Sequence, residues 1–166
     1  MTAEAWPAQL AHALVAAGVE VAAWVPDKRL DPIVTALAGA GLPVRTLTRE
    51  EECVGYAAGY RAAGGMPLVL MQCSGLGNAL NAIGSLVIPY GLGFPLIVSM
   101  RGTLGERNPA QIPMGRATVA MLALLGIQSF SLHSPHEIPA LVRGAMNLAD
   151  GARQVAPIIL EPGLDP

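Results

Sequence analysis

Charged residues are scarce in this sequence. They make up 13% of its 166 residues, about half of the usual quarter, and the net charge is −2. This balance leaves neither a basic patch for nucleic acid nor a block of like charges for a tail. A monomer needs more polar surface than this, so we expect part of the surface to face other protein.

Cysteine is also scarce, which excludes several classes of protein. Cys53 and Cys73 are too few for a disulfide framework. No Cys, His or Asp pattern has the spacing of a metal cluster or a catalytic triad. The first residues, Met1–Glu4, lack the basic region and apolar run of a signal peptide. We therefore expect a cytoplasmic protein with no metal ligands of its own.

A long apolar run is missing, although the middle of the chain carries no charge. No Asp, Glu, Lys or Arg occurs from Ala62 to Met100. Glycine, proline and amide residues interrupt this stretch, so no run of about 18 apolar residues, as a membrane span needs, remains. We exclude a transmembrane helix and expect the stretch to form buried sheet and a subunit interface.

The sequence does have six short apolar runs, separated by segments of helical periodicity. Strands that alternate with helices imply crossover connections and a parallel sheet. Nearly continuous apolar strands fit a sheet covered on both faces. Residues 1–166 are thus predicted to form one doubly wound α/β domain with a mainly parallel six-stranded sheet flanked by helices. The predicted strands are Val21–Val25, Pro43–Leu47, Leu68–Gln72, Pro95–Met100, Ile127–Leu132 and Pro157–Leu160, and the predicted helices are Ala5–Ala17, Leu30–Ala38, Glu50–Ala63, Leu76–Val87, Thr118–Leu125 and His136–Leu148.

Two sequence signatures mark helix starts. Thr48 with Glu51, and Ser134 with Glu137, have the spacing of capping boxes. The longest piece without a clear element is Arg101–Arg116. A loop of that length in a compact domain is usually functional or mobile.

The predicted fold selects the segments where a ligand could bind. In open parallel sheets, ligands bind outside the carboxyl ends of the strands. Four segments meet this condition: Pro26–Arg29, Thr48–Glu52, Cys73–Asn78 and Arg101–Thr103.

Each of these segments has a structural and a functional interpretation. The carboxylates of Glu50–Glu52 suit the first turn of a helix, where they cap free N–H groups and oppose the macrodipole. Ser74–Asn78 looks like a phosphate loop at a helix N-terminus. It lacks the third glycine of a dinucleotide fingerprint and a Walker lysine, so it also fits a tight strand-to-helix turn. Lys28, the only lysine, suits either an anionic substrate or a plain surface position.

Several of these motifs resemble one enzyme family. The segment Thr48–Tyr60 resembles the pyrimidine-domain signature of thiamine-diphosphate enzymes. In that family a catalytic glutamate lies nine residues before the glycine of an Ala-x-Gly-Tyr pattern. Counting back nine residues from Gly59 gives Glu50. Met71–Asn81 looks like the strand-turn-helix of the phosphonopyruvate and sulfopyruvate decarboxylases. Val25–Asp27 matches the loop after their first strand. Arg101-Gly102 and Gln111–Thr118 are closest to the sulfopyruvate branch.

The sequence also departs from the family pattern. Family members need a diphosphate-binding domain marked by Gly-Asp-Gly, and this chain has no Gly-Asp-Gly. The resemblance therefore implies a separate alpha subunit whose beta subunit carries that domain and holds Mg²⁺. It implies a hetero-oligomer of alpha-beta pairs, as a dimer of pairs or larger. The segment Glu106–Gln111 lacks the acidic and histidine residues expected from the phosphonopyruvate branch, and the paired histidines of pyruvate-decarboxylase-like enzymes are absent.

The resemblance also implies roles for individual residues. Glu50 would be the catalytic residue, bonded to N1′ of the pyrimidine ring of thiamine diphosphate. Further cofactor contacts are implied for Pro26, Gln72, Ser74, Gly75, Leu76 and Asn78, and substrate contacts for Asp27, Lys28, Arg101 and Gln111.

Three functions remain open at this point. The first is the alpha subunit of a decarboxylase for a small anionic 2-oxoacid, either 3-sulfopyruvate, which would yield sulfoacetaldehyde and CO₂, or 3-phosphonopyruvate. The second is a related carboligase or a decarboxylase of another 2-oxoacid. The third is a non-catalytic nucleotide-binding regulatory module that uses the Ser74–Asn78 turn. Glu50 separates the third from the others, because a phosphate-only site has no use for a buried carboxylate there. No nucleic acid or membrane is expected as a partner.

Overall fold

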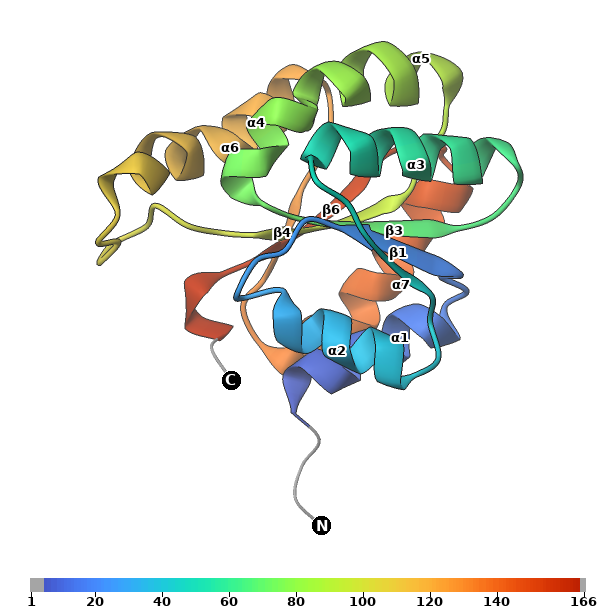
Figure 1. Ribbon diagram of the computed structural model, residues 1–166, viewed down its shortest axis with the longest axis horizontal. Coiled ribbons are helices and arrows are strands. Elements are labelled where there is room, and N and C mark those ends of the chain that lie inside the picture. The colour runs from blue at the N-terminus through green and yellow to red at the C-terminus, as the bar shows by residue number, and fades with distance from the viewer. Residues whose placement is uncertain (1–4, 165–166) are drawn as a thin grey trace.

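The computed structural model describes residues 5–164 and contains a six-stranded sheet (Figure 1). Every neighbouring pair of strands is parallel, and the order across the sheet is β2-β1-β3-β4-β6-β5. The predicted strands and the parallel sheet are thereby confirmed. The strands are β1 (Val21–Trp24), β2 (Val44–Thr46), β3 (Pro67–Gln72), β4 (Pro95–Ser99), β5 (Phe130–Leu132) and β6 (Ala156–Leu160).

Helices cover both faces of the sheet, as a doubly wound fold requires (Figure 1). One face carries α1, α2 and α7, and the other carries α3, α4, α5 and α6. The helices are α1 (Trp6–Ala16), α2 (Asp31–Gly39), α3 (Glu50–Ala62), α4 (Cys73–Ala82), α5 (Ile88–Tyr90), α6 (Ile112–Leu124) and α7 (Ile138–Asp150), and a π-helical segment, Ile83–Val87, joins α4 to α5.

The core consists of one apolar layer on each face of the sheet. Side chains alternate between the faces of a strand. In β3, Leu68 and Leu70 pack in the layer beneath α1, α2 and α7, whereas Val69 and Met71 pack beneath α3 and α4. The central strands β1, β4 and β6 are buried at every position. Burial on both faces explains why these strands read as continuous apolar runs.

Helix α3 begins at Glu50, as the sequence predicts, but its capping box differs from the predicted one by one residue. Oε2 of Glu52 accepts hydrogen bonds from the Thr48 hydroxyl (2.7 Å) and from the main-chain N–H groups of Thr48 (3.1 Å) and Arg49 (3.3 Å). The bonds from Thr48 lower the pKa of Glu52. Pairing Thr48 with Glu51 was wrong because Arg49 is the N-cap, which makes Glu52 the third helical residue. Glu51 instead forms an ion pair with Arg49 at 2.6 Å.

The second capping box is confirmed. Oε2 of Glu137 accepts hydrogen bonds from the N–H groups of Ser134 (3.0 Å) and His133 (2.8 Å). These bonds fix a 3₁₀ turn, Pro135–Glu137, that leads into α7. They also lower the pKa of Glu137.

Two helices begin earlier than the sequence predicts. The helix expected from Leu76 begins at Cys73, so Ser74–Asn78 is helical and not an open phosphate loop. The helix expected from Thr118 begins at Ile112, after a 3₁₀ turn at Pro109–Gln111. Gly115 does not break that helix; a β-carbon there would overlap the main-chain carbonyl of Arg101. The glycine therefore serves close packing between α6 and the chain that leaves β4.

The uncharged middle of the chain is central to the fold. It forms β3, α4, α5 and β4, so the prediction of buried sheet is confirmed, while the prediction of a subunit interface stays a prediction. Within residues 5–164 no helix is long and apolar enough to cross a membrane. Cys53 and Cys73 are both buried with free thiols. Met1–Glu4, which the signal-peptide argument concerns, lie outside the described residues.

Candidate active site

The sheet has a topological switch point between β1 and β3. From β1 the chain crosses to β2 on one side, and from β3 it proceeds to β4 on the other. The loops that leave β1 and β3 therefore diverge, and such a divergence is where open α/β sheets bind ligands. Asp27 lies in the loop after β1, and Gln72 is the last residue of β3.

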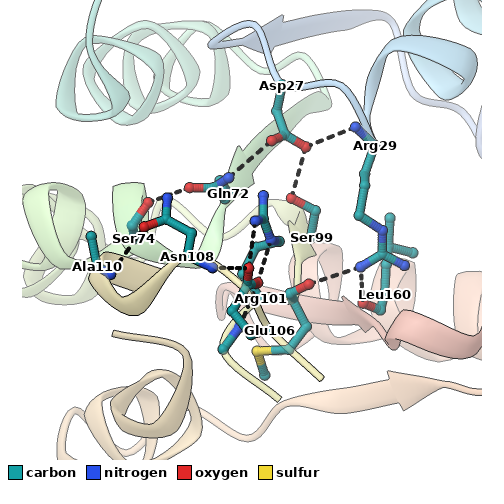
Figure 2. Close-up of polar contacts among 12 residues, drawn as sticks. Asp27, Arg29, Gln72, Ser74, Ser99, Arg101, Glu106, Asn108, Ala110 and Leu160 are labelled. Carbon is teal, nitrogen blue, oxygen red and sulfur yellow. Dashed lines mark hydrogen bonds and ion pairs between the residues drawn. The ribbon is translucent and has the colours of Figure 1, made fainter. Parts of the chain in front are cut away.

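Asp27 is the centre of a hydrogen-bond network at this point (Figure 2). Its Oδ2 accepts a bond from Nε2 of Gln72 at 3.0 Å, and its Oδ1 accepts bonds from the Ser99 hydroxyl at 3.0 Å and the Arg29 main-chain N–H at 3.1 Å. Oε1 of Gln72 in turn accepts a bond from the Ser74 hydroxyl. One carboxylate thus joins the carboxyl ends of β1, β3 and β4.

The Arg29 side chain forms hydrogen bonds at the same edge of the sheet. Its guanidinium donates to the carbonyl oxygens of Met100 (2.8 Å) and Glu161 (2.8 Å), which follow β4 and β6. Sequence reasoning placed Arg29 in a candidate ligand-binding segment without giving it a role, and it missed Ser99. Ser99 did carry a signal, because it is the polar residue that ends an otherwise apolar strand.

Glu50, the predicted catalytic residue, lies on the other side of the β3–α4 junction. It is the first residue of α3, and its carboxylate lies against Gly75 in the first turn of α4. Its Oε2 accepts a bond from Nδ2 of Asn78 at 3.3 Å. Within residues 5–164 this carboxylate forms no ion pair with Lys or Arg, so it keeps acceptor capacity for a ligand.

The structure brings together most of the residues with implied cofactor contacts. Ser74, Gly75 and Asn78 share the first two turns of α4, and Gln72 immediately precedes that helix. Pro26 is exposed on the loop that carries Asp27. The Leu76 side chain, on the inner face of α4, is fully buried and packs in the apolar core between the sheet and helices α3 and α4.

Lys28 lies apart from the Asp27 network. It is exposed, and it lines a cavity of about 280 Å³ together with Trp24, Pro26, Asp27 and Asp31. No other residue of the described chain, 5–164, bonds to its ammonium group. The structure thus places a free cation beside Asp27.

Arg101 is engaged by its own loop. Its Nε and Nη2 donate to the two carboxylate oxygens of Glu106 at 2.7 and 2.9 Å. The main-chain N–H groups of Gly102 (3.3 Å) and Asn108 (2.9 Å) donate to the same carboxylate. The arginine and these N–H groups lower the pKa of Glu106 to about 2, and Glu106 raises the pKa of Arg101. Sequence reasoning named Arg101 but not Glu106.

Gln111 lies where the loop joins α6. Its Oε1 is buried and accepts no hydrogen bond from the described residues. Its main-chain carbonyl packs against Gly102, where an added β-carbon would lie 2.5 Å from that oxygen. Among residues 5–164 no group of three His, Cys, Asp or Glu side chains converges to hold a metal ion.

Comparison with known proteins gives consistent matches. The family described as "Thiamine pyrophosphate enzyme, N-terminal TPP binding domain" matches residues 7–101. The chain is 37% identical to sulfopyruvate decarboxylase subunit alpha of Methanococcus maripaludis, over 90% of both chains. It is 43% identical to the subunit of the same name from Methanothermobacter thermautotrophicus, over 73% of this chain and 74% of that one. It is 33% identical to phosphonopyruvate decarboxylase of Streptomyces viridochromogenes, over 73% of this chain and 31% of that one.

A solved structure shares the fold. The chain superposes on the 2-oxoglutarate:ferredoxin oxidoreductase from Magnetococcus marinus with a TM-score of 0.70 and 15% identity. The match covers 96% of this chain and 29% of the oxidoreductase chain. At this identity the likeness establishes the fold alone.

Proposed function

This chain belongs to the thiamine pyrophosphate enzymes, whose N-terminal TPP binding domain it contains, and we propose that it is the alpha subunit of a sulfopyruvate decarboxylase. The observation that carries the proposal is the 37–43% identity to two proteins of that name, one of them matched over 90% of both chains. The reaction would convert 3-sulfopyruvate to sulfoacetaldehyde and CO₂.

The geometry around Glu50 fits the pyrimidine end of thiamine diphosphate. When bound, the cofactor supplies the electron sink that a 2-oxoacid needs as it loses CO₂, because no side chain can provide one. Glu50 would accept a hydrogen bond from the pyrimidine N1′ and hold the proton there, which the open acceptor positions on its carboxylate allow. Gly75 leaves room for the Glu50 carboxylate, and Asn78 orients it.

The Asp27 network would bind and orient the substrate. Three donors fix the Asp27 carboxylate, so it supplies a rigid polar edge at the switch point. Lys28 and Arg101 follow β1 and β4, the two strands that flank β3, and would bind the anionic groups of the 2-oxoacid, with Gln111 contacting the substrate through its side-chain amide. Charge-assisted hydrogen bonds of this kind suit a carboxylate or a sulfonate.

We further propose that a beta subunit completes the site. Among residues 5–164 no cluster of three Asp, Glu, His or Cys side chains could hold Mg²⁺, and the sequence has no Gly-Asp-Gly to bind the diphosphate with it. The beta subunit would therefore hold the diphosphate and Mg²⁺, in a cytoplasmic hetero-oligomer.

A second substrate deserves the same test. The 33% identity to a phosphonopyruvate decarboxylase favours 3-phosphonopyruvate as the alternative. Its phosphonate resembles a sulfonate in size and differs in charge.

Two experiments test the proposal. The chain, produced with a beta subunit that carries Gly-Asp-Gly, should release CO₂ from 3-sulfopyruvate faster than from 3-phosphonopyruvate or pyruvate in the presence of thiamine diphosphate and Mg²⁺. Preference for another 2-oxoacid would overturn the substrate assignment. Isothermal titration of the chain alone with the cofactor and Mg²⁺ should show weak binding; micromolar affinity without a partner would contradict the split site.

A further inference from the structure

The carboxylate of Glu106 occupies a complete anion-binding site. Two guanidinium N–H groups of Arg101 and the main-chain N–H groups of Gly102 and Asn108 converge on its two oxygens at 2.7–3.3 Å. The Glu106 side chain is only 9% exposed, so water competes little for these bonds. The four donors carry no acceptor of their own, which makes the site selective for anions.

The loop that delivers Glu106 has little else to hold it. Residues 103–106 line two cavities, one of about 380 Å³ toward Arg29 and Pro162 and one of about 470 Å³ toward Ile112 and Gly115. Leu104 at the loop tip is 106% exposed, although an apolar side chain gains by burial. The Glu106 carboxylate is thus the main anchor of a segment that has empty space on both sides.

Gly105, next to Glu106, can act as a hinge. Its φ angle is +90°, a region that glycine enters at little cost. A β-carbon on Gly105 would meet no atom within 4 Å, so this part of the chain can move without displacing packed neighbours. Rotation at such residues is a common way for an active-site loop to open and close.

Protonation cannot empty this site at neutral pH. The pKa of Glu106 is about 2, so the carboxylate stays charged. It leaves only by exchange with another anion. A group tethered by a short loop has an effective concentration on the order of millimolar, and a substrate anion at a comparable concentration can compete with it.

From these observations we propose that the site formed by Arg101, Gly102 N–H and Asn108 N–H binds the distal sulfonate of the substrate, and that Glu106 is its internal competitor. This inference rests on the proposed function for the identity of the anion. When the sulfonate displaces Glu106, the loop is released from its anchor, and Leu104 becomes free to fold over one of the adjacent cavities. Glu106 would thereby set the substrate affinity and couple it to loop position.

Binding of a simple sulfonate tests the site without any turnover. Ethanesulfonate is titrated into the full chain while the N–H signals of Gly102 and Asn108 are followed by NMR. Glu106→Gln keeps the side-chain shape and removes the charge, so it should lower the Kd at least tenfold relative to the unmodified chain. The double variant Arg101→Ala/Glu106→Gln should lose that gain.

Two further variants test whether the change in Kd is specific to the charge and position of Glu106. Glu137→Gln removes a carboxylate that also accepts two main-chain N–H bonds, at the start of α7, and should leave the Kd unchanged. Glu106→Asp keeps the charge but shortens the reach, and should give a smaller gain than Glu106→Gln. A Kd that is unchanged or higher in both Glu106 variants, or a gain that survives Arg101→Ala, would overturn the proposal.

Kinetics of the assembled enzyme then identify which anion of the substrate binds here. Glu106→Gln should lower KM for 3-sulfopyruvate and leave KM for pyruvate unchanged. An equal fall for both would assign the site to the shared carboxylate and refute the sulfonate assignment, and a rise in KM for 3-sulfopyruvate would make Glu106 a structural latch. If no decarboxylation occurs at all, the proposed function fails, while the ethanesulfonate titration still decides whether Glu106 competes for the site.

Discussion

The Glu50 carboxylate lies directly against the α-carbon of Gly75. A β-carbon on Gly75 would overlap Oε1, Cδ and Cγ of Glu50. Glu50 begins α3 and Gly75 lies in the first turn of α4, so this contact joins two helices at the carboxyl edge of the sheet. The glycine at this position therefore determines where the proposed catalytic carboxylate can lie.

Replacing Gly75 by alanine should lower activity about 100-fold while preserving the fold. The overlap falls on the end of a flexible side chain, so Glu50 can rotate away by on the order of 1 Å, a misplacement that can lower turnover by about 100-fold. Alanine also favours the helical conformation, so the melting temperature should not fall. CO₂ release and thermal melting of the assembled enzyme measure both effects.

Gly77→Ala is the matched control, two residues along the same helix. Its β-carbon would lie 2.5 Å from the terminal methyl group of Met114, which can move without disturbing Glu50. Activity should stay within a few-fold of the unmodified enzyme. Equal losses in both variants would mean that α4 itself, and not the position of Glu50, is sensitive.

The three adjacent glutamates of α3 should separate by function. Glu50→Gln should abolish turnover with assembly intact, because an amide cannot hold the pyrimidine proton. Glu52→Gln should lower the melting temperature by about 2–4 °C, because it weakens the cap at Thr48 and Arg49. Glu51→Gln should change neither much, since its ion pair is with the exposed side chain of Arg49 and an exposed partner makes such a pair weak. Loss of turnover in Glu51→Gln alone would shift the catalytic assignment by one residue.

The sequence predicts the sheet well because each strand is recognisable from its own residues alone. Strands buried on both faces need runs of apolar residues, and such runs are visible without any knowledge of neighbours. The end of β3 and the start of α3 could be located in the same way, which placed Gln72 and Glu50 at one edge of the sheet.

The errors of the sequence prediction come from contacts between distant segments. Gly75 and Gly115 fell outside the predicted helices, in a turn and in a loop, but each lies in a helix and provides space for a neighbour: the Glu50 side chain and the carbonyl of Arg101. The residues bonded by the Arg29 guanidinium, and Gln72 and Ser99 at the Asp27 carboxylate, lie more than forty positions away along the chain, so no local pattern indicates them. Arg49 is not a typical N-cap residue, so the capping box was assigned to Thr48 and Glu51 and not to Arg49 and Glu52.

Cys53 should be chemically inert in the folded protein. Burial, and then the negative charges of Glu50 and Glu52, raise the pKa of its thiol to about 12, and alkylation requires the thiolate. Iodoacetamide at pH 8 should therefore label Cys53 only at the rate of unfolding, as peptide mass spectrometry with and without denaturant would show. Rapid labelling of Cys53 in the native protein would contradict this environment.

The same thiol should make stability depend on pH in alkaline solution. A pKa that folding raises contributes stability that is complete below the unfolded value of about 9 and declines as pH rises toward 12. In that window each pH unit should cost roughly 1.4 kcal/mol. Urea unfolding of the unmodified chain and Cys53→Ala between pH 8 and 11 measures the difference, and Cys73→Ala, which retains Cys53, is the control. An identical slope in Cys53→Ala would assign the effect to other groups.

Lys28 should distinguish substrates by their distal charge. It is a free cation in the loop after β1, beside Asp27. A sulfonate has three oxygens, so one held by the Arg101 site can also accept a charge-assisted bond from Lys28, which is worth roughly a tenfold change in affinity or more. Lys28→Ala should therefore raise KM for 3-sulfopyruvate about tenfold and leave the slow reaction of pyruvate nearly unchanged. Arg143→Ala, which removes an exposed cation from α7, should affect neither substrate. Steady-state kinetics of both variants decide the role of Lys28. An equal rise in KM for the two substrates would place Lys28 at the shared carboxylate or the cofactor. An unchanged KM for both would make it a surface residue.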